Sequence, residues 1–198
     1  EQITATTNDE GRFELNGAPL GGGHGIEVHP SSELPYFDTQ FELPLSSNAV
    51  PLKCKLELRK TKWIHGRVTD EAGRPVAAKL NSYPFLENQH AEKFSNDNPN
   101  VRGTPDDKIA SNVNGEFRIQ AISGPAILAA YVTDQEEQPK YLPNRADGLL
   151  DRIGGEQMTK MFDGWSADYF DAMVEVNIDP DVNDIEQNLV FKRGGILP

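Results

Sequence analysis

The stretch that decides the fold is Ile64-His65-Gly66-Arg67-Val68-Thr69-Asp70-Glu71-Ala72-Gly73-Arg74-Pro75-Val76-Ala77. Its first half places Ile64, Gly66 and Val68 two residues apart, which puts them on one face of a β-strand. A glycine and a proline follow. Glycine tolerates the positive φ of a turn, and proline at the first position of a strand removes no ladder donor. The stretch therefore predicts a strand, a tight turn and a second strand.

Alternating apolar residues recur through the rest of the chain. They predict strands in 62–70, 75–83, 116–119, 126–132, 174–178 and 185–191, with a weak one near Ile109. About seven short strands separated by turn residues are typical of an antiparallel β-sandwich. Hydrophobic residues at 37%, together with 17 Gly and 14 Pro, fit a loop-rich, mainly β protein better than a helical bundle.

The chain also repeats itself. Residues 7–15 resemble 111–119 at a shift of 104, and both contain a polar turn, a glycine, and a Phe followed two positions later by an aliphatic residue. Residues 41–60 resemble 174–193 at a shift of 133. Because the two shifts differ by 29 residues, the second copy contains an insertion, which we place at 142–173.

This repeat defines the expected domain organisation. Residues 1–60 correspond to the C-terminal part of one β-sandwich repeat, 61–193 to a complete repeat with the insertion, and 194–198 to the start of a further repeat. The pattern predicts a piece of a longer tandem array. Since residues 1–60 lack the first strands of their unit, we expect them to pack against the complete unit or to pair with another chain.

Charge and cysteine content exclude several classes of function. The 198 residues include 19 Lys and Arg against 31 Asp and Glu, a formal net charge of −12. So acidic a chain disfavours nucleic acid and anionic lipid as partners, because both require a positive patch. No apolar run approaches the roughly 18 residues of a membrane-spanning helix, so direct membrane insertion is not expected. The single cysteine excludes an internal disulfide framework.

The predicted insertion has helical rather than alternating periodicity. Its Met and aromatic residues recur at spacings of three and four, which predicts two short helices that cap one end or edge of the sandwich. Trp165, Tyr169 and Phe170 could then form a platform that stacks on a sugar or a peptide. The alternative is that this stripe packs against the sheet, as such stripes more often do.

The stretch that begins at Ile64 resembles the opening signature of carboxypeptidase regulatory-like domains, roughly G-x-V-x-D-x-x-G-x-P-V-x-x-A. The matching residues are Gly66, Val68, Asp70, Gly73, Pro75 and Val76. Residues 114–119 resemble a second landmark of the family, an Asp/Asn-Gly-x-Phe strand start, and residues 9–13 are a closer copy of it. Related Cna-B-type modules share much of this pattern. The resemblance implies a transthyretin-like sandwich, from which the loop at 87–108 and the insertion depart.

The resemblance implies a non-catalytic accessory or interaction module of a larger secreted, surface or membrane-anchored protein, with a peptidase as one conceivable neighbour. Such a module is expected outside the cytoplasm. Its expected role is to space or orient neighbouring domains of the same polypeptide, and the segments 87–108 and 142–173 are the expected contact surfaces. A glycan- or peptide-binding module that uses the insertion is the alternative, which would add a protein or carbohydrate ligand. A hydrolase comes third, since the chain contains neither a G-x-S-x-G nor an H-E-x-x-H motif.

Calcium is the one metal that the sequence leaves open, and no other cofactor is expected. Asp179, Asp181, Asn183 and Asp184 lie close together in one loop, and calcium favours such sets of hard oxygen ligands. Their spacing departs from the EF-hand loop, and Asx-Pro turns use the same residue types structurally.

The lone cysteine is expected in a core. Cys54 alternates with Leu52, Leu56 and Leu58, so the four side chains share one face of a predicted strand. This pattern predicts that Cys54 is a small buried residue rather than a nucleophile.

Overall fold

The computed structural model describes residues 3–17, 24–43, 51–91, 110–132, 141, 148–149, 151–153 and 170–193. The prediction of a mainly β fold is confirmed. The described elements are β1 (Gly25–Val28), β2 (Thr39–Glu42), β3 (Lys62–Asp70), β4 (Lys79–Pro84), β5 (Glu116–Ala121), β6 (Gly124–Tyr131), the 3-10 helix η2 (Asp151–Ile153), β7 (Ala172–Ile178), β8 (Asp184–Glu186) and β9 (Leu189–Phe191). No helix in this part of the chain has the length and apolar character needed to cross a membrane.

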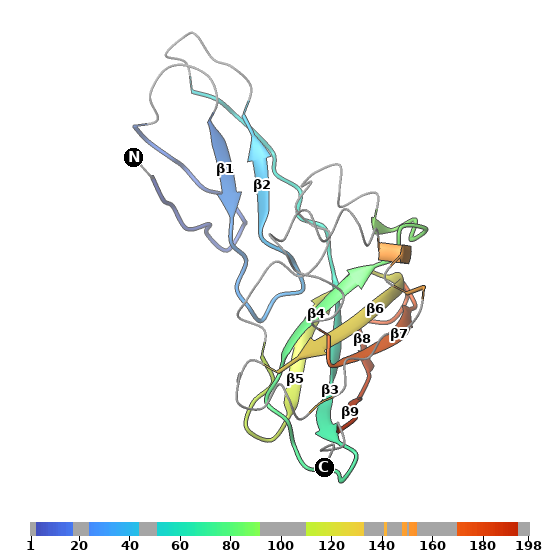
Figure 1. Ribbon diagram of the computed structural model, residues 1–198. Coiled ribbons are helices and arrows are strands. Elements are labelled where there is room, and N and C mark those ends of the chain that lie inside the picture. The colour runs from blue at the N-terminus through green and yellow to red at the C-terminus, as the bar shows by residue number, and fades with distance from the viewer. Residues whose placement is uncertain are drawn as a thin grey trace.

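Strands β3 to β9 form two stacked sheets (Figure 1). One sheet has the order β5-β3-β8, with β9 also paired to β3, and the other has the order β4-β6-β7. The apolar faces of the two sheets meet in one core, where Ile64, Val68, Ile119, Leu128 and Phe191 are fully buried. The alternation of Ile64 and Val68 in the sequence thus marks the central strand of the first sheet.

The expectation of a wholly antiparallel sandwich is wrong at one edge. Strands β8 and β9 run parallel to β3, with Trp63 paired to Asp184 and Val68 to Leu189. After β7 the chain crosses to the other sheet through a turn and arrives at the first residues of β3, where Trp63 N donates to Asn183 O at 3.0 Å. It therefore enters beside the start of β3 and continues in the same direction. The weak strand near Ile109 lies outside the described residues, although Ala110 forms a β-bridge with Lys79.

The β4-β6-β7 sheet is buried on both faces. In β6, residues 126, 128 and 130 face the inter-sheet core, whereas 127, 129 and 131 belong to a second apolar cluster on the outer face. The other members of this second cluster are Tyr83, Phe85, Ile153, Phe170, Met173 and the half-buried Leu149. Within the predicted insertion, Leu149, Ile153, Phe170 and Met173 therefore pack on the outer face of this sheet. The last two residues of the insertion already belong to β7, and the predicted helical stripe up to Tyr169 lies outside the described residues.

Arg152 links η2 to this sheet through a ring contact and hydrogen bonds. Its guanidinium lies 3.6 Å from the centre of the Phe85 ring and donates to Glu87 Oε1 at 2.5 Å and to Glu175 Oε1 at 3.1 Å. Arg152 O accepts a hydrogen bond from Leu86 N at 2.6 Å. One residue of the insertion thus contacts β7 and the segment that follows β4.

Three tight turns share one geometry. In each turn an Asp or Asn side chain accepts hydrogen bonds from the backbone N–H groups two and four residues later. The turns cover residues 8–12, 70–74 and 112–116, and their glycines, three positions after the Asp or Asn, have φ angles of 73°, 74° and 77°. Glycine adopts such a φ without steric cost, so the Asp/Asn-x-x-Gly spacing is a backbone requirement.

The described residues between 3 and 60, here called the N-terminal unit, contain the antiparallel pair β1 and β2. By analogy with the complete repeat, strands were also expected near 13–15 and 52–58, but residues 3–17 and 51–59 belong to no strand. The counterparts of these segments, β5 and β8–β9, all pair with β3. The described part of the N-terminal unit offers no such partner strand.

Candidate functional site

Phe170 is part of the core. It is 5% exposed, and its ring packs edge-on against Tyr83 and Tyr131, with centroid separations of 5.9 and 6.5 Å. This burial favours packing over ligand stacking for Phe170. The other two residues of the expected platform, Trp165 and Tyr169, lie outside the described residues.

The acidic loop between β7 and β8 is built as a hydrogen-bonded turn. Asp179 Oδ1 accepts from Asp181 N at 2.8 Å, which is the Asx-turn alternative to metal binding. Two lysines also contact the loop, since Lys60 Nζ donates to Asn183 Oδ1 at 3.1 Å and Lys62 Nζ donates to Pro180 O at 2.5 Å. Within the described residues no three His, Cys, Asp or Glu side chains gather closely enough to hold a metal ion.

We expect calcium to leave the stability of the chain unchanged. The ammonium groups of Lys60 and Lys62 already occupy oxygens of the loop, and their charge would oppose a cation beside Asp179. Melting temperatures in millimolar calcium and in chelator are expected to agree. A ligand that binds only the folded state must raise the melting temperature. A higher melting temperature in calcium than in chelator, which Asp181→Asn abolishes, would therefore contradict this expectation.

The prediction of a buried Cys54 is wrong, because the side chain is exposed. Alternation predicts which residues share a face, but burial also needs a second layer over that face. Residues 51–55 are all exposed, whereas Leu56 and Leu58 are half-buried.

The four histidines are dispersed, and His29 Nδ1 lies 2.8 Å from Asp38 Oδ2 in an exposed pair.

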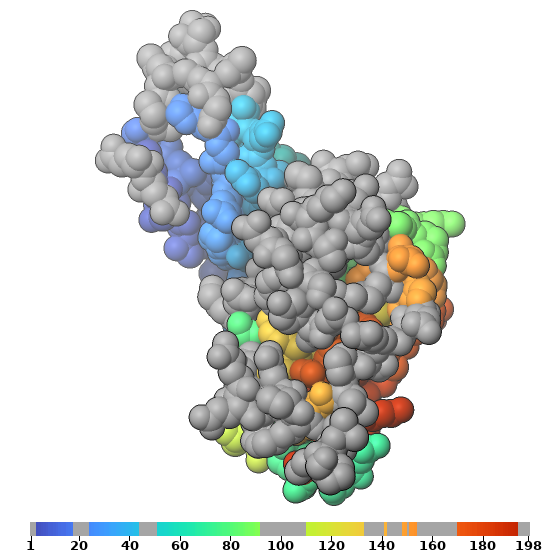
Figure 2. Space-filling view, in the orientation of Figure 1, coloured from blue at the N-terminus to red at the C-terminus, as the bar shows by residue number. Residues whose placement is uncertain are grey.

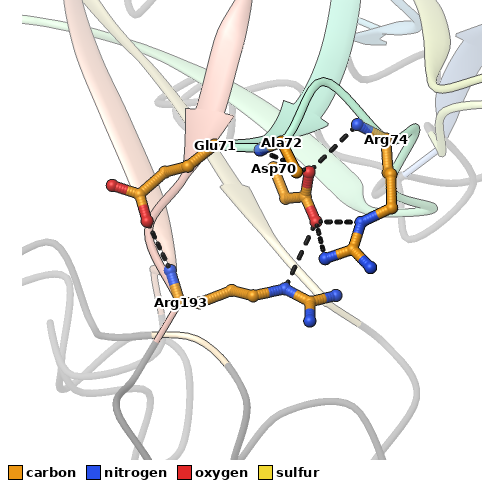
Figure 3. Close-up of polar contacts among 5 residues, drawn as sticks. All are labelled: Asp70, Glu71, Ala72, Arg74 and Arg193. Carbon is orange, nitrogen blue, oxygen red and sulfur yellow. Dashed lines mark hydrogen bonds and ion pairs between the residues drawn. The ribbon is translucent and has the colours of Figure 1, made fainter.

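The buried carboxylate of Asp70 contacts Ala72, Arg74 and Arg193 (Figure 3). It is 2% exposed, and its Oδ1 accepts from Ala72 N at 2.9 Å and from Arg74 N at 3.0 Å. Its Oδ2 lies 2.7 Å from Arg74 Nη2 and 3.2 Å from Arg193 Nε. The cluster joins the end of β3, the following turn and the segment after β9, so its evident role is structural.

The carboxyl of Asp70 is held in its charged form. Burial by itself raises its pKa, but hydrogen bonds from the Arg74 amide and guanidinium and from Ala72 N outweigh this effect and bring the pKa below its usual value. The stabilisation is therefore present above the unfolded-state pKa of about 3.9 and is lost as the pH falls through the lower folded-state value.

Asp70→Asn is expected to lower the melting temperature at pH 7 and to flatten its decline below about pH 4. The turn itself should survive, since Asn8 and Asn112 hold the same position in the other two turns. Thermal unfolding between pH 2 and 7 measures both effects, with Asp9→Asn, an exposed turn position, as the control. If both variants followed the wild-type pH profile, the Asp70 cluster would not contribute through its charge.

An open groove lies where the start of β6 meets the end of β7. Its lining includes Glu87, His90, Gly124, Asn177 and Asp179. Glu87 and His90 come from the loop at 87–108, which is predicted to be a contact surface. Residues 87–91 are the described part of this loop, and 92–108 lie outside the described residues.

The N-terminal unit meets the sandwich at a defined junction. Phe37 and Ile122, which are 7% and 3% exposed, pack together with Ala91 beside them. Two backbone carbonyls of the N-terminal unit accept hydrogen bonds across the junction: Pro35 O from Thr61 N at 2.7 Å, and Leu34 O from Gln120 Nε2 at 2.9 Å. In the space-filling view the atoms of β1 and β2 form a lobe that projects from the body of the sandwich (Figure 2).

An exposed ion pair also links the two segments that meet at this junction. Arg118 Nη1 lies 3.5 Å from Glu33 Oε2, and its guanidinium lies 3.9 Å from the centre of the Trp63 ring. Exposed ion pairs stabilise little, so the apolar contact and the two hydrogen bonds to backbone carbonyls carry the junction. These residues belong to no motif of the sequence. The one signal that the sequence contains is Phe37, an aromatic residue that lies outside the alternating pattern and follows a Pro-Tyr pair.

Comparisons with known proteins identify no family. No protein-family model matches the chain, and no curated protein matches it. Among solved structures it is similar to one titled "Structure of the Streptococcal ancillary pilin", with 12% sequence identity, a TM-score of 0.32, and coverage of 96% of this chain and 50% of that chain. The chain thus spans half the length of that protein. A similarity of this size assigns neither a family nor a function.

Proposed function

We propose that this chain is a non-catalytic accessory module that spaces and orients neighbouring β domains within a larger extracytoplasmic protein. The observation that carries the proposal is the junction between the N-terminal unit and the sandwich. Phe37 and Ile122 form a buried apolar contact there, and hydrogen bonds to Pro35 O and Leu34 O join the same two parts of the chain. Such a junction restricts the angle between two units, which a flexible linker would leave free.

The roles of the signature residues support an architectural function. Gly66 lies against the backbone of Gln187, and Asp70 closes a turn and binds two arginines. The residues that carry the resemblance to carboxypeptidase regulatory-like domains thus hold β3 in place. The location outside the cytoplasm and a peptidase as neighbour rest on that resemblance and belong to the proposal.

The proposal is tested by measuring the distance distribution between the two units. Spin labels at Gln40→Cys in β2 and Val190→Cys in β9, in a Cys54→Ser background, report this distance by pulsed electron resonance; all three positions are exposed. A single narrow distribution is expected. Phe37→Ala should broaden it, because truncation removes the apolar contact of the junction.

Phe41→Ala is the matched control, since it shortens a half-buried aromatic residue of β2 that is not part of the junction cluster. It is expected to leave the distribution narrow. A broad distribution in the parent protein, or equal broadening in both variants, would refute an orienting role for the junction.

A further inference from the structure

The segment that follows β4 folds back around the side chain of Asn88, which is 3% exposed. Asn88 Nδ2 donates to Ser123 O at 2.9 Å and to Pro125 O at 3.0 Å. Asn88 Oδ1 accepts from His90 N at 2.9 Å. Both hydrogens of the amide nitrogen are thus used, and the amide oxygen has a partner as well. A buried side chain that is satisfied in this way fixes the backbone segments that it joins.

The Asn88 amide spans the connection between β5 and β6. Its two acceptors, Ser123 O and Pro125 O, belong to the residues on either side of Gly124 in the chain. Gly124 has a φ of 93°, and a Cβ there would lie 2.8 Å from Asn88 Oδ1 and 3.0 Å from Asn88 Nδ2. An approach this close, at this φ, requires a glycine. The turn at 85–91 therefore lies directly against the β5–β6 connection.

Both segments that Asn88 joins reach the apolar contact of the junction. Ala91 N donates to Asn88 O at 3.0 Å, so Ala91 closes the turn. Ile122 immediately precedes Ser123, whose carbonyl accepts from Asn88 Nδ2. Phe37 of the N-terminal unit packs with Ile122 and Ala91, which are here called the platform. The two residues of the platform lie on different segments, and the Asn88 side chain connects these segments.

We propose that Asn88 is a positioning residue, which sets the orientation of the N-terminal unit by holding the two halves of the platform together. The inference rests on the proposed orienting function and adds the residue of the sandwich that controls the angle. Its side-chain hydrogen bonds lie within the sandwich, so its effect on the N-terminal unit passes through the platform. Without this side chain the turn at 85–91 loses its hydrogen bonds to the β5–β6 connection from that amide. The platform then loosens, although Phe37 itself is unchanged.

The pair of spin labels in β2 and β9 measures this effect. Asn88→Ala should broaden the distance distribution between the two units about twofold or more, although it changes no residue of the N-terminal unit. Ser111→Ala is the matched control. Ser111 is also buried in the sandwich, where its Oγ donates to Val76 O at 3.0 Å and accepts from Ala78 N at 2.9 Å. Both variants should lower the melting temperature, but Ser111→Ala should leave the distribution narrow, because Ser111 is not part of the junction cluster.

Gly124→Ala tests the same side chain from the β5–β6 connection. Its Cβ would displace the Asn88 amide, so it should also broaden the distribution. Added to Asn88→Ala, it should broaden the distribution no further, because the side chain that it displaces is gone.

A narrow distribution in Asn88→Ala, equal broadening by Ser111→Ala, or additive broadening in the double variant would overturn the inference. The orienting function would survive each of these results if Phe37→Ala still broadened the distribution. A broad distribution in the parent chain would instead refute the orienting function, and the role of Asn88 with it.

Discussion

Replacing Gly66 with alanine is expected to lower the unfolding free energy of the sandwich by about 3 kcal/mol or more. A Cβ at this position would lie 1.9 Å from Gln187 O and 2.7 Å from Gln187 C, which is closer than real Cβ atoms approach. Both atoms belong to the backbone of Gln187, and hydrogen bonds on either side of Gly66 hold this segment against β3. Gln187 N donates to His65 O at 2.8 Å, and Arg67 N donates to Asn188 Oδ1 at 2.8 Å. The added methyl must therefore separate β3 from the segment that joins β8 to β9.

The matched control is Gly25→Ala in β1. Its Cβ would have its nearest neighbours at 3.3 Å, the flexible side-chain Gln40 Nε2 and the carbonyl Phe41 O, and the position is exposed. The expected cost is below about 1 kcal/mol. Denaturant unfolding followed by circular dichroism measures both variants. If they lost equal stability, the close approach at Gly66 would not be a constraint on the fold.

Gly115→Ala is expected to be the second severe substitution, at about 3 kcal/mol. The positive φ of 77° alone costs an alanine about 1 kcal/mol. The remainder comes from the approach of its Cβ to within 2.3 Å of Val68 O, a carbonyl that accepts from Val76 N at 3.1 Å. Because Val68 N donates to Gly115 O at 2.8 Å, moving the turn away would also break that bond.

Gly11→Ala separates these two contributions. Gly11 lies in the same kind of turn with nearly the same φ. Among the described residues its Cβ would meet no atom within 4 Å, so only the conformational cost of about 1 kcal/mol is expected. The difference in unfolding free energy between the two alanine variants therefore measures the packing of β3 on the 112–116 turn. Equal losses would mean that φ alone decides both sites.

The strands could be predicted from the sequence where alternation and turn residues agree. The stretch from Ile64 to Ala77 predicted β3 and its turn correctly, since both depend on residues close together in the chain. The second strand starts later than predicted, at Lys79, because Pro75 forms only an isolated bridge with Thr69. The parallel pairing of β8 and β9 with β3 could not be predicted, because the point where the chain crosses between sheets is a long-range property.

Burial was harder to predict than strand position. Alternation placed Cys54 on an apolar face, but no second layer covers that part of the N-terminal unit among the described residues. The two alternatives for Phe170 differed in burial alone, and the sequence does not show that Tyr83 and Tyr131 would surround its ring. The contact between Phe37 and Ile122 could not be predicted for the same reason, since the two residues lie 85 positions apart in the chain.

An orienting function requires that the N-terminal unit and the sandwich form one rigid body. Residual dipolar couplings of backbone amides test it most directly, because they report the orientation of each N–H bond in one common frame. We expect a single alignment tensor to fit the amides of β1 and β2 together with those of β3 to β9. Two tensors that differ in magnitude or direction would show independent motion of the two units and would refute a fixed orientation between them.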